Sequence, residues 1–179
     1  MKRKAFFFDR DGVVVKQVHY LCDPEKTELE KNVVQAIRKL RNKDYMIIVV
    51  TNQSGVARGK FTMREVEAVH KKIESLLAEE NEKIDAFYIC PHHPDFDGEC
   101  DCRKPAPGLI LRAAEEHDID VSSSVMVGDK LSDVKCGENA GVRYSLLIAT
   151  GYGSGERQKA GAENVLFVND LEEAADKFS

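Results

Sequence analysis

The sequence predicts an α/β fold, a Rossmann-like three-layer sandwich with a mainly parallel central sheet. Three observations support this prediction. Short, nearly continuous apolar runs alternate with amphipathic helical segments, the runs are rich in β-branched and aromatic residues, and most runs end at polar residues. Continuous apolar strands are typical of a parallel sheet that helices cover on both faces. At this length, we expect residues 1–179 to form a single domain.

Six short apolar runs are the predicted strands of this sheet. They are residues 5–8, 46–50, 86–89, 124–127, 144–149 and 164–168. Each run is too short for a typical helix and is separated from the next by polar or helix-period sequence.

Four segments between the runs have the apolar spacing of helices: residues 29–43, a segment after Thr62, a segment that begins at Pro107, and residues 132–140. Thr62 and Glu65 have the spacing of a capping box, which predicts a helix start. The intervals on either side of the second run have room for one helix each, so we predict a capless core. Residues 151–155 are predicted to be a flexible turn, because they lack the Lys-Ser/Thr ending of a phosphate-binding loop.

The composition excludes several classes of protein. The net charge of −5 gives no basic surface for nucleic acid. No run approaches the roughly 18 apolar residues of a membrane span, and the basic start MKRK precedes too short an apolar run for a secretory signal. We therefore expect a cytoplasmic protein, and the lack of a long apolar surface stripe makes a monomer the expected state.

Polar side chains gather where the predicted strands end. In a parallel α/β sheet these ends lie along one edge, where ligands bind. The residues expected to converge there are Asp9, Asp11, Thr51, Asn52, Gln53, Ser54, Arg103, Lys104, Asp129 and Asp133.

This set of residue types suits phosphoryl transfer. Asp9 and Asp129 offer the hard anionic oxygens that Mg²⁺ prefers, and a carboxylate beside such a cation can attack phosphorus. Asp11 could protonate the leaving oxygen and then activate water. Thr51 and Lys104 could stabilise the phosphoryl oxygens.

The segment after the second strand offers a further phosphate contact. Asn52, Gln53 and Ser54 could open a helix whose free backbone N–H groups hold a phosphate. The same polar segment could equally be an ordinary loop.

The cysteines predict a second metal site. Cys90-Pro-His92 and Cys100-Asp-Cys102 are two pairs with the same spacing, and a set of this type matches a closed tetrahedral zinc site. His93 is the alternative to His92 as a ligand. The remaining cysteines, Cys22 and Cys136, are expected to be packing or surface residues.

Four motifs resemble those of the haloacid dehalogenase-like phosphatases: FFFDRDGVV, VVTNQSG, CRKPAPG and VGDKLSD, across about residues 4–149. The resemblance implies that Asp9 is the nucleophile and a Mg²⁺ ligand. It implies that Asp11 is the general acid/base and binds the metal through its carbonyl, while Asp129 binds through its carboxylate. It further implies that Thr51 and Lys104 steady the phosphoryl group, and that the substrate is recognised by Arg103 and Lys130.

More narrowly, the motifs resemble a subgroup of phosphatases that act on D-glycero-D-manno-heptose 1,7-bisphosphate or on histidinol phosphate. The subgroup's zinc loop has the same CxH…CxC form, so zinc is expected to shape the wall beside Arg103. The expected reaction is removal of the 7-phosphate. Histidinol-phosphate hydrolysis is the first alternative, and a zinc-stabilised binding module without activity is the second.

Two details refine this expectation. Many relatives have Thr-Ile-Asn where this chain has residues 13–15, Val-Val-Val, so any contact made by that Asn is absent. Asp133, one helical turn after Asp129, is expected to orient the site and not to bind the metal. With no cap, the open site would be shaped by residues 16–23 and the zinc loop, residues 90–102.

Overall fold

The computed structural model describes residues 2–159 and 164–179. Within them, six strands form one sheet of order β3-β2-β1-β4-β5-β6, and every neighbouring pair is parallel. The predicted α/β class is therefore confirmed. The strands are β1 (Lys4–Phe8), β2 (Tyr45–Asn52), β3 (Ala86–Cys90), β4 (Val125–Gly128), β5 (Tyr144–Ile148) and β6 (Leu166–Val168).

Helices connect these strands. The longer ones are α1 (Val33–Arg41), α2 (Met63–Ala78), α4 (Gly108–His117), α5 (Leu131–Ala140) and α7 (Leu171–Phe178). Shorter helical turns are η1 (Pro24–Lys26), α3 (Pro94–Asp97), η2 (Val121–Ser123) and α6 (Gly153–Glu156). The predicted capping box of α2 is confirmed, with bonds from both Thr62 and Glu65.

One helix prediction and one turn prediction were wrong in detail. The helix expected over residues 29–43 begins only at Val33, because Asn32 has a left-handed backbone (φ 64°) and Leu29 pairs instead with Val15. The turn expected over residues 151–155 includes the start of α6. No helix was predicted for α7, which packs on α1 through ion pairs of Lys39 with Glu172 and Asp176.

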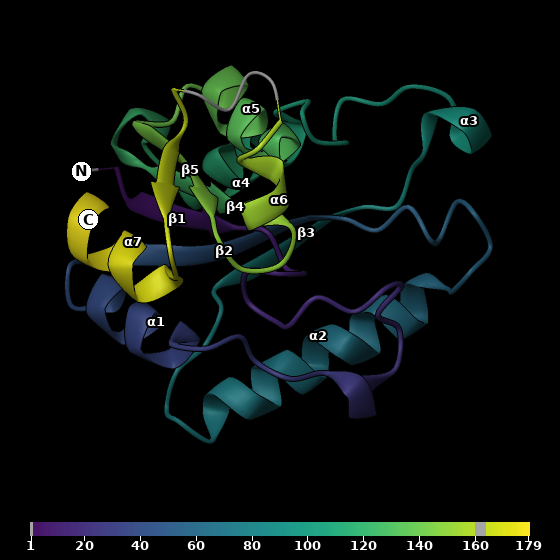
Figure 1. Cartoon of the computed structure of the whole chain (residues 1–179), viewed down its shortest axis with the longest axis horizontal. Coiled ribbons are helices and arrows are strands. Elements are labelled where there is room, and N and C mark those ends of the chain that lie inside the picture. Colours follow the sequence, from purple (N-terminus) through teal and green to yellow (C-terminus); the bar gives the residue numbers. More distant parts are fainter. Residues whose placement is uncertain (1, 160–163) are drawn as a thin grey trace.

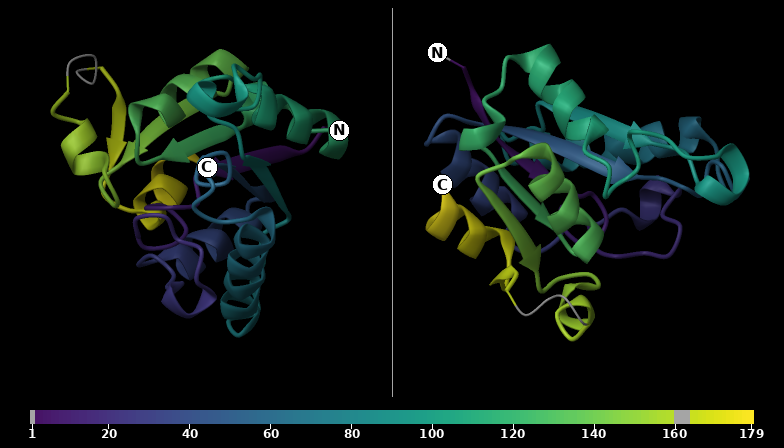
Figure 2. Two further views of the ribbon diagram at one scale, coloured as in Figure 1. Left: turned by 90° about the vertical axis from the view of Figure 1, so that its right-hand side faces the viewer. Right: turned by 90° about the horizontal axis from the view of Figure 1, so that it is seen from above.

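The helices form two layers around the sheet (Figures 1 and 2). One layer, below the sheet in Figure 1, consists of α1, α2 and α7, whereas α4 and α5 cover the opposite face. Between β1 and β2 the chain contains only η1 and α1, and between β2 and β3 only α2, so residues 9–85 contain no inserted cap. In the described part of the chain, none of the helices is both long enough and apolar enough to span a membrane.

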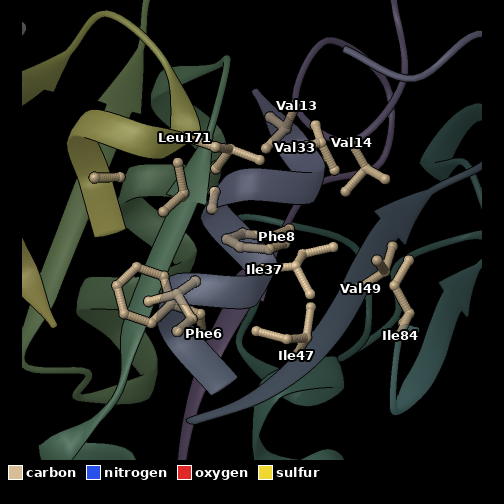
Figure 3. Close-up of a cluster of buried hydrophobic side chains, with 14 of the residues drawn as sticks. Phe6, Phe8, Val13, Val14, Val33, Ile37, Ile47, Val49, Ile84 and Leu171 are labelled. Carbon is tan, nitrogen blue, oxygen red and sulfur yellow. The ribbon is translucent and has the colours of Figure 1, made fainter. Parts of the chain in front are cut away.

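The larger core cluster fixes the alignment of the strands. Phe6, Phe8, Ile47 and Val49 point from β1 and β2 toward the helical layer that contains Ile37 (Figure 3). Complete burial of such side chains contributes about 1.5–3 kcal/mol each. The same alignment pairs Phe8 with Val49 on one side and with Val127 on the other, which brings the ends of β1, β2 and β4 to one edge.

Candidate active site

Three carboxylates meet at this edge. Asp9 follows β1, Asp129 follows β4, and Asp133 lies in the first turn of α5; each offers an oxygen within 4.8 Å of the others. All three residues are buried, with exposed fractions of 5%, 0% and 1%. Buried carboxylates at such distances repel one another unless a cation lies between them. The cluster therefore has the charge and the donor atoms of a cation site.

Lys104 neutralises part of this charge. Its Nζ lies 2.8 Å from Asp9 Oδ1 and 2.7 Å from Asp133 Oδ1, and it donates to the Val50 carbonyl at 2.9 Å. These acceptors use all three N–H bonds of the ammonium group. Burial alone would lower the pKa of Lys104, but Asp133 and Asp9 together raise it above its ordinary value. Lys104 is thus a fixed positive charge beside Asp9.

Asp129 is the carboxylate with spare bonding capacity. Its Oδ2 accepts a hydrogen bond from the Tyr152 backbone N–H at 2.9 Å, whereas its buried Oδ1 has no hydrogen-bond partner among the described residues. Burial, followed by the charge of Asp9, raises the pKa of Asp129 to about 7. A buried acceptor without a donor, next to a second carboxylate, fits a bound divalent cation.

Two glycines allow the backbone to surround this carboxylate. A Cβ at Gly12 (φ +81°) would lie 2.4 Å from Asp129 Oδ2, and one at Gly151 (φ +57°) would lie 2.2 Å from it. Thr150 Oγ1 also donates to the Gly12 carbonyl at 2.5 Å. The segment after β5 is therefore part of the site, which the sequence interpretation missed. The one available signal was its position after an apolar strand.

Asp11 lies at the boundary between this buried cluster and a surface cavity. Its Oδ2 accepts from Gln53 Nε2 at 2.9 Å, and the same Nε2 donates to Thr51 Oγ1 at 2.9 Å. Arg10 forms an ion pair with Asp11 at 3.0 Å. The ends of β1 and β2 are linked by these side chains.

The cavity contains part of the predicted substrate site. Residues 17–21, from the loop predicted to shape the site, line the cavity together with Asp11 and residues 52–55 and 61. Lys130 and Tyr152 also contribute to the lining, and Lys130 Nζ lies 5.0 Å from the centre of the Tyr152 ring. An anionic group in this cavity would therefore meet the charge of Lys130.

The polar segment after β2 does not open a helix. Residues 54–60 form turns, and α2 begins only at Met63, so the predicted helical phosphate site was wrong. Asn52 instead makes two reciprocal hydrogen bonds, both 3.1 Å long, with the backbone N–H and carbonyl of Lys104. This pair of bonds holds the backbone that carries Lys104.

Arg103 is not in the cavity that contains Lys130. It lines a separate hollow with residues 94, 98–100, 104 and 105, and its Nη1 donates to the His92 carbonyl at 3.1 Å. The loop of the cysteine cluster therefore forms the surroundings of Arg103, as expected, but does not line the cavity that contains Lys130.

The predicted Cys/His ligands form a compact cluster at the base of the segment containing α3, which projects from the rest of the fold (Figure 1). Cys102 Sγ lies 3.0 Å from Cys90 Sγ, 3.5 Å from Cys100 Sγ and 3.4 Å from His92 Nδ1. His93 points elsewhere, with its Nε2 2.6 Å from Arg58 Nη2. Facing soft donors at these separations suit a tetrahedral zinc ion.

The pKa values of the thiols in this cluster differ from the ordinary value of cysteine. Burial raises the pKa of Cys90 above its usual range. Burial also raises the pKa of Cys100, but its hydrogen bonds, above all the one with Cys102, have the larger combined effect. They lower the pKa of Cys100 to about 7. Cys136, by contrast, is buried outside the cluster, where its Sγ donates to the Ala106 carbonyl at 3.3 Å.

Comparison with known proteins agrees with this architecture. A family model described as HAD-hydrolase-like matches residues 101–174. In structure, the chain superimposes on the D,D-heptose 1,7-bisphosphate phosphatase of B. bronchiseptica, solved with magnesium and phosphate, with a TM-score of 0.87 and 34% identity over 97% of this chain and 96% of that one. Fold and site therefore define a haloacid dehalogenase-like hydrolase.

Curated relatives narrow the class. The chain is 37% identical to a D-glycero-alpha-D-manno-heptose-1,7-bisphosphate 7-phosphatase of Photorhabdus laumondii, over 95% of this chain and 93% of that protein. It is 40% identical to the D-glycero-beta-D-manno-heptose-1,7-bisphosphate 7-phosphatase of Escherichia coli K12, over 82% of this chain and 80% of that protein. The chain belongs to the family of the heptose-1,7-bisphosphate 7-phosphatases within the haloacid dehalogenase-like hydrolases. It is a phosphomonoester hydrolase, and the resemblance of its motifs is confirmed.

Proposed function

We propose that this protein removes the 7-phosphate of D-glycero-D-manno-heptose 1,7-bisphosphate through an aspartyl-phosphate on Asp9. The observation that carries the proposal is the position of Asp9, whose Oδ1 is held by the Lys104 ammonium at 2.8 Å and by the Arg10 backbone N–H at 2.8 Å. Within the described residues, no hydrogen bond engages its Oδ2, so this oxygen is available for attack. The family relationship supports the choice of substrate, and it favours an active phosphatase over a binding module without activity.

In this mechanism Asp11 handles the protons. Its carboxylate lines the cavity, and as a general acid it would protonate the leaving sugar oxygen as the bond to phosphorus breaks. The same group then accepts a proton from the water that hydrolyses the intermediate. The Thr51 hydroxyl is proposed to donate to the phosphoryl oxygens, while Lys104, whose N–H bonds are already used, stabilises them through its positive charge.

Magnesium is the proposed cofactor of this site, held by the carboxylates of Asp9 and Asp129 and by the carbonyl of Asp11. When bound, it offsets the negative charge of carboxylates and phosphate. The unpartnered Oδ1 of Asp129 supports this assignment. Asp133 is an orienting residue in this scheme, because it is paired with Lys104 and accepts from the Lys130 backbone N–H at 3.0 Å.

Magnesium is expected to stabilise the protein more at about pH 8 than at about pH 5. The pKa of Asp129 rises from 3.8 to about 7 on folding. A raised carboxyl pKa lowers the stability of the metal-free protein as pH increases from about 4 to about 7, by a loss on the order of 4 kcal/mol. A cation that binds the ionised group offsets this loss. Thermal unfolding with and without Mg²⁺ at both pH values measures the difference; an equal gain at both would contradict the assignment.

We assign zinc to Cys90, His92, Cys100 and Cys102 as a structural metal. Cys102 lies two residues before Lys104, so an ordered cluster restrains the backbone of a catalytic residue. The facing sulfur and nitrogen atoms support a closed site, without a free position for substrate.

Recognition of the sugar is assigned to residues on both sides of Asp11. Lys130 is suited to the distal phosphate or a hydroxyl, and Ser54 lines the same cavity. Asn52 and Gln53 line this cavity and also hold Lys104 and Asp11, and Arg103 is proposed to contribute from its separate hollow. A monomer and a cytoplasmic location stay predictions.

A phosphate-release assay tests the function. Both anomers of the heptose bisphosphate and histidinol phosphate are compared, with and without Mg²⁺, and phosphorus NMR identifies which phosphate leaves. We expect Mg²⁺-dependent release from position 7 and a kcat/KM at least about 100-fold above that for histidinol phosphate. Preference for histidinol phosphate, or release from position 1, would overturn the substrate assignment.

A further inference from the structure

A buried arginine lies directly behind the proposed acid/base. The Arg10 side chain is only 1% exposed, yet its Nε lies 3.2 Å from both oxygens of Asp11 and its Nη2 lies 3.0 Å from Oδ1. Burial of a guanidinium group is unfavourable unless its donors are paired. Arg10 Nε and Nη2 both donate to the Asp11 carboxylate, and these bonds restrain its orientation.

His70 is the second partner of Arg10. It lies on α2, is 6% exposed, and stacks on Phe87 with ring centres 4.2 Å apart. Its Nε2 is 3.5 Å from Arg10 Nη1. Since a guanidinium can only donate, a hydrogen bond between them requires Nε2 to accept and the ring proton to be on Nδ1. Burial, and then the charge of Arg10, lower the pKa of His70 to about 3, so the ring stays neutral in ordinary buffers.

Asp11 is also held from the side of the cavity. Gln53 Nε2 donates to its Oδ2 at 2.9 Å, while Arg10 Nη2 donates to the carbonyl of Leu21 at 3.4 Å. Leu21 belongs to the loop that lines the cavity. Arg10 thus connects the proposed acid/base with both the α2 helix and the loop that lines the cavity.

We propose that Arg10 and His70 form a buried brace that fixes the Asp11 carboxylate toward the cavity, so that both are positioning residues for proton transfer. The inference rests on the proposed acid/base role of Asp11. Proton transfer requires the carboxylate to stay within hydrogen-bond reach of the leaving oxygen. A carboxylate that rotates away contributes to catalysis only in part of its conformations, even when substrate binding is intact.

The leaving group separates a positioning role from a general structural one. A sugar alkoxide must be protonated as it leaves, whereas dinitrophenolate is a weak base and leaves without an acid. First-turnover release of dinitrophenolate from dinitrophenyl phosphate therefore reports on Asp9 and the phosphoryl site, independently of Asp11. Turnover of the heptose bisphosphate reports on both.

The first variant is Arg10→Lys, which keeps the positive charge but loses the planar guanidinium group that donates to both oxygens of Asp11. The second is His70→Phe, which keeps an aromatic ring in place but loses the ring nitrogen that faces Arg10. Each is expected to lower kcat for the bisphosphate by about 10- to 100-fold, with KM and first-turnover dinitrophenolate release changed by less than about 3-fold. His70→Gln, which restores an acceptor, should recover activity relative to His70→Phe. Ile73→Val, a buried change on the same helix, is the matched control.

Two results would overturn the brace. One is a loss of activity that is equal for the bisphosphate and for dinitrophenyl phosphate. The other is a wild-type rate of bisphosphate turnover by His70→Phe. If Arg10→Lys does not fold, the His70 variants alone test the proposal. Asp11→Asn separates the brace from the proposed function. Asp11→Asn is expected to lose turnover of the bisphosphate while keeping first-turnover release of dinitrophenolate. If it does so and the Arg10 and His70 variants do not, the brace alone is wrong. If Asp11→Asn itself shows no such difference, the role of Asp11 is wrong and the brace with it.

Discussion

Replacing Asp9 by asparagine is expected to lower kcat by about 10⁴-fold or more, because an amide does not attack phosphorus. The fold should persist. The Asn oxygen can still accept from Lys104 and from the Arg10 backbone N–H, and the charge that repels Asp129 is removed. The measurement is phosphate release, together with the mass of protein quenched during turnover. Wild type is expected to carry a phosphoryl group that the variant lacks.

The control for this prediction is Asp176→Asn, another carboxylate that pairs with a lysine. Asp176 lies on α7 and contacts Lys39 on the surface, away from the site. It should retain wild-type kcat and the phosphoryl adduct. Phosphate release by Asp9→Asn within about tenfold of wild type would rule out covalent catalysis at this residue.

Loss of the zinc cluster is expected to have the second largest effect. In Cys100→Ala, we expect zinc content to fall well below one ion per chain and residues 91–101 to become sensitive to protease. Metal binding supplies much of the order of such loops. Because Cys102 is separated from Lys104 by one residue, kcat is expected to fall by about 10²-fold as the ammonium group loses its position.

Cys22→Ala is the matched control, since Cys22 is a free thiol outside the cluster. It should retain zinc, protease resistance and kcat. Full zinc content and normal kinetics in Cys100→Ala would show that the cluster has another role. Zinc is measured by metal analysis after gel filtration, with Mg²⁺ present to keep the two metals distinct.

The sheet could be predicted because its strands are buried on both faces. Phe6, Phe8, Ile47 and Val49 belong to apolar runs that only a covered parallel sheet can bury, and the resulting alignment also predicts that Asp9 and Asp129 converge. The convergence of Cys90, His92, Cys100 and Cys102 was predictable from their spacing, and their binding of zinc stays a prediction. That residues 1–179 form a single domain stays a prediction.

The missed features depend on contacts between distant segments. Tyr152 contributes a backbone N–H to Asp129, and a backbone donor has no residue-type signature in a sequence. His70 is one polar position on an amphipathic helix and has no further signature in the sequence, because only the packing of α2 brings it to Arg10. Asn32 stops α1 early through its backbone conformation, which helical periodicity does not report.

The central claim is that Asp9 forms a covalent intermediate, and the stereochemical course at phosphorus tests it most directly. A substrate with an isotopically chiral 7-phosphate is hydrolysed, and the configuration of the transferred group is determined. Two successive in-line displacements, first by Asp9 and then by water, each invert the phosphorus centre. The account therefore predicts net retention of configuration. Net inversion would mean a single direct attack by water and would contradict it.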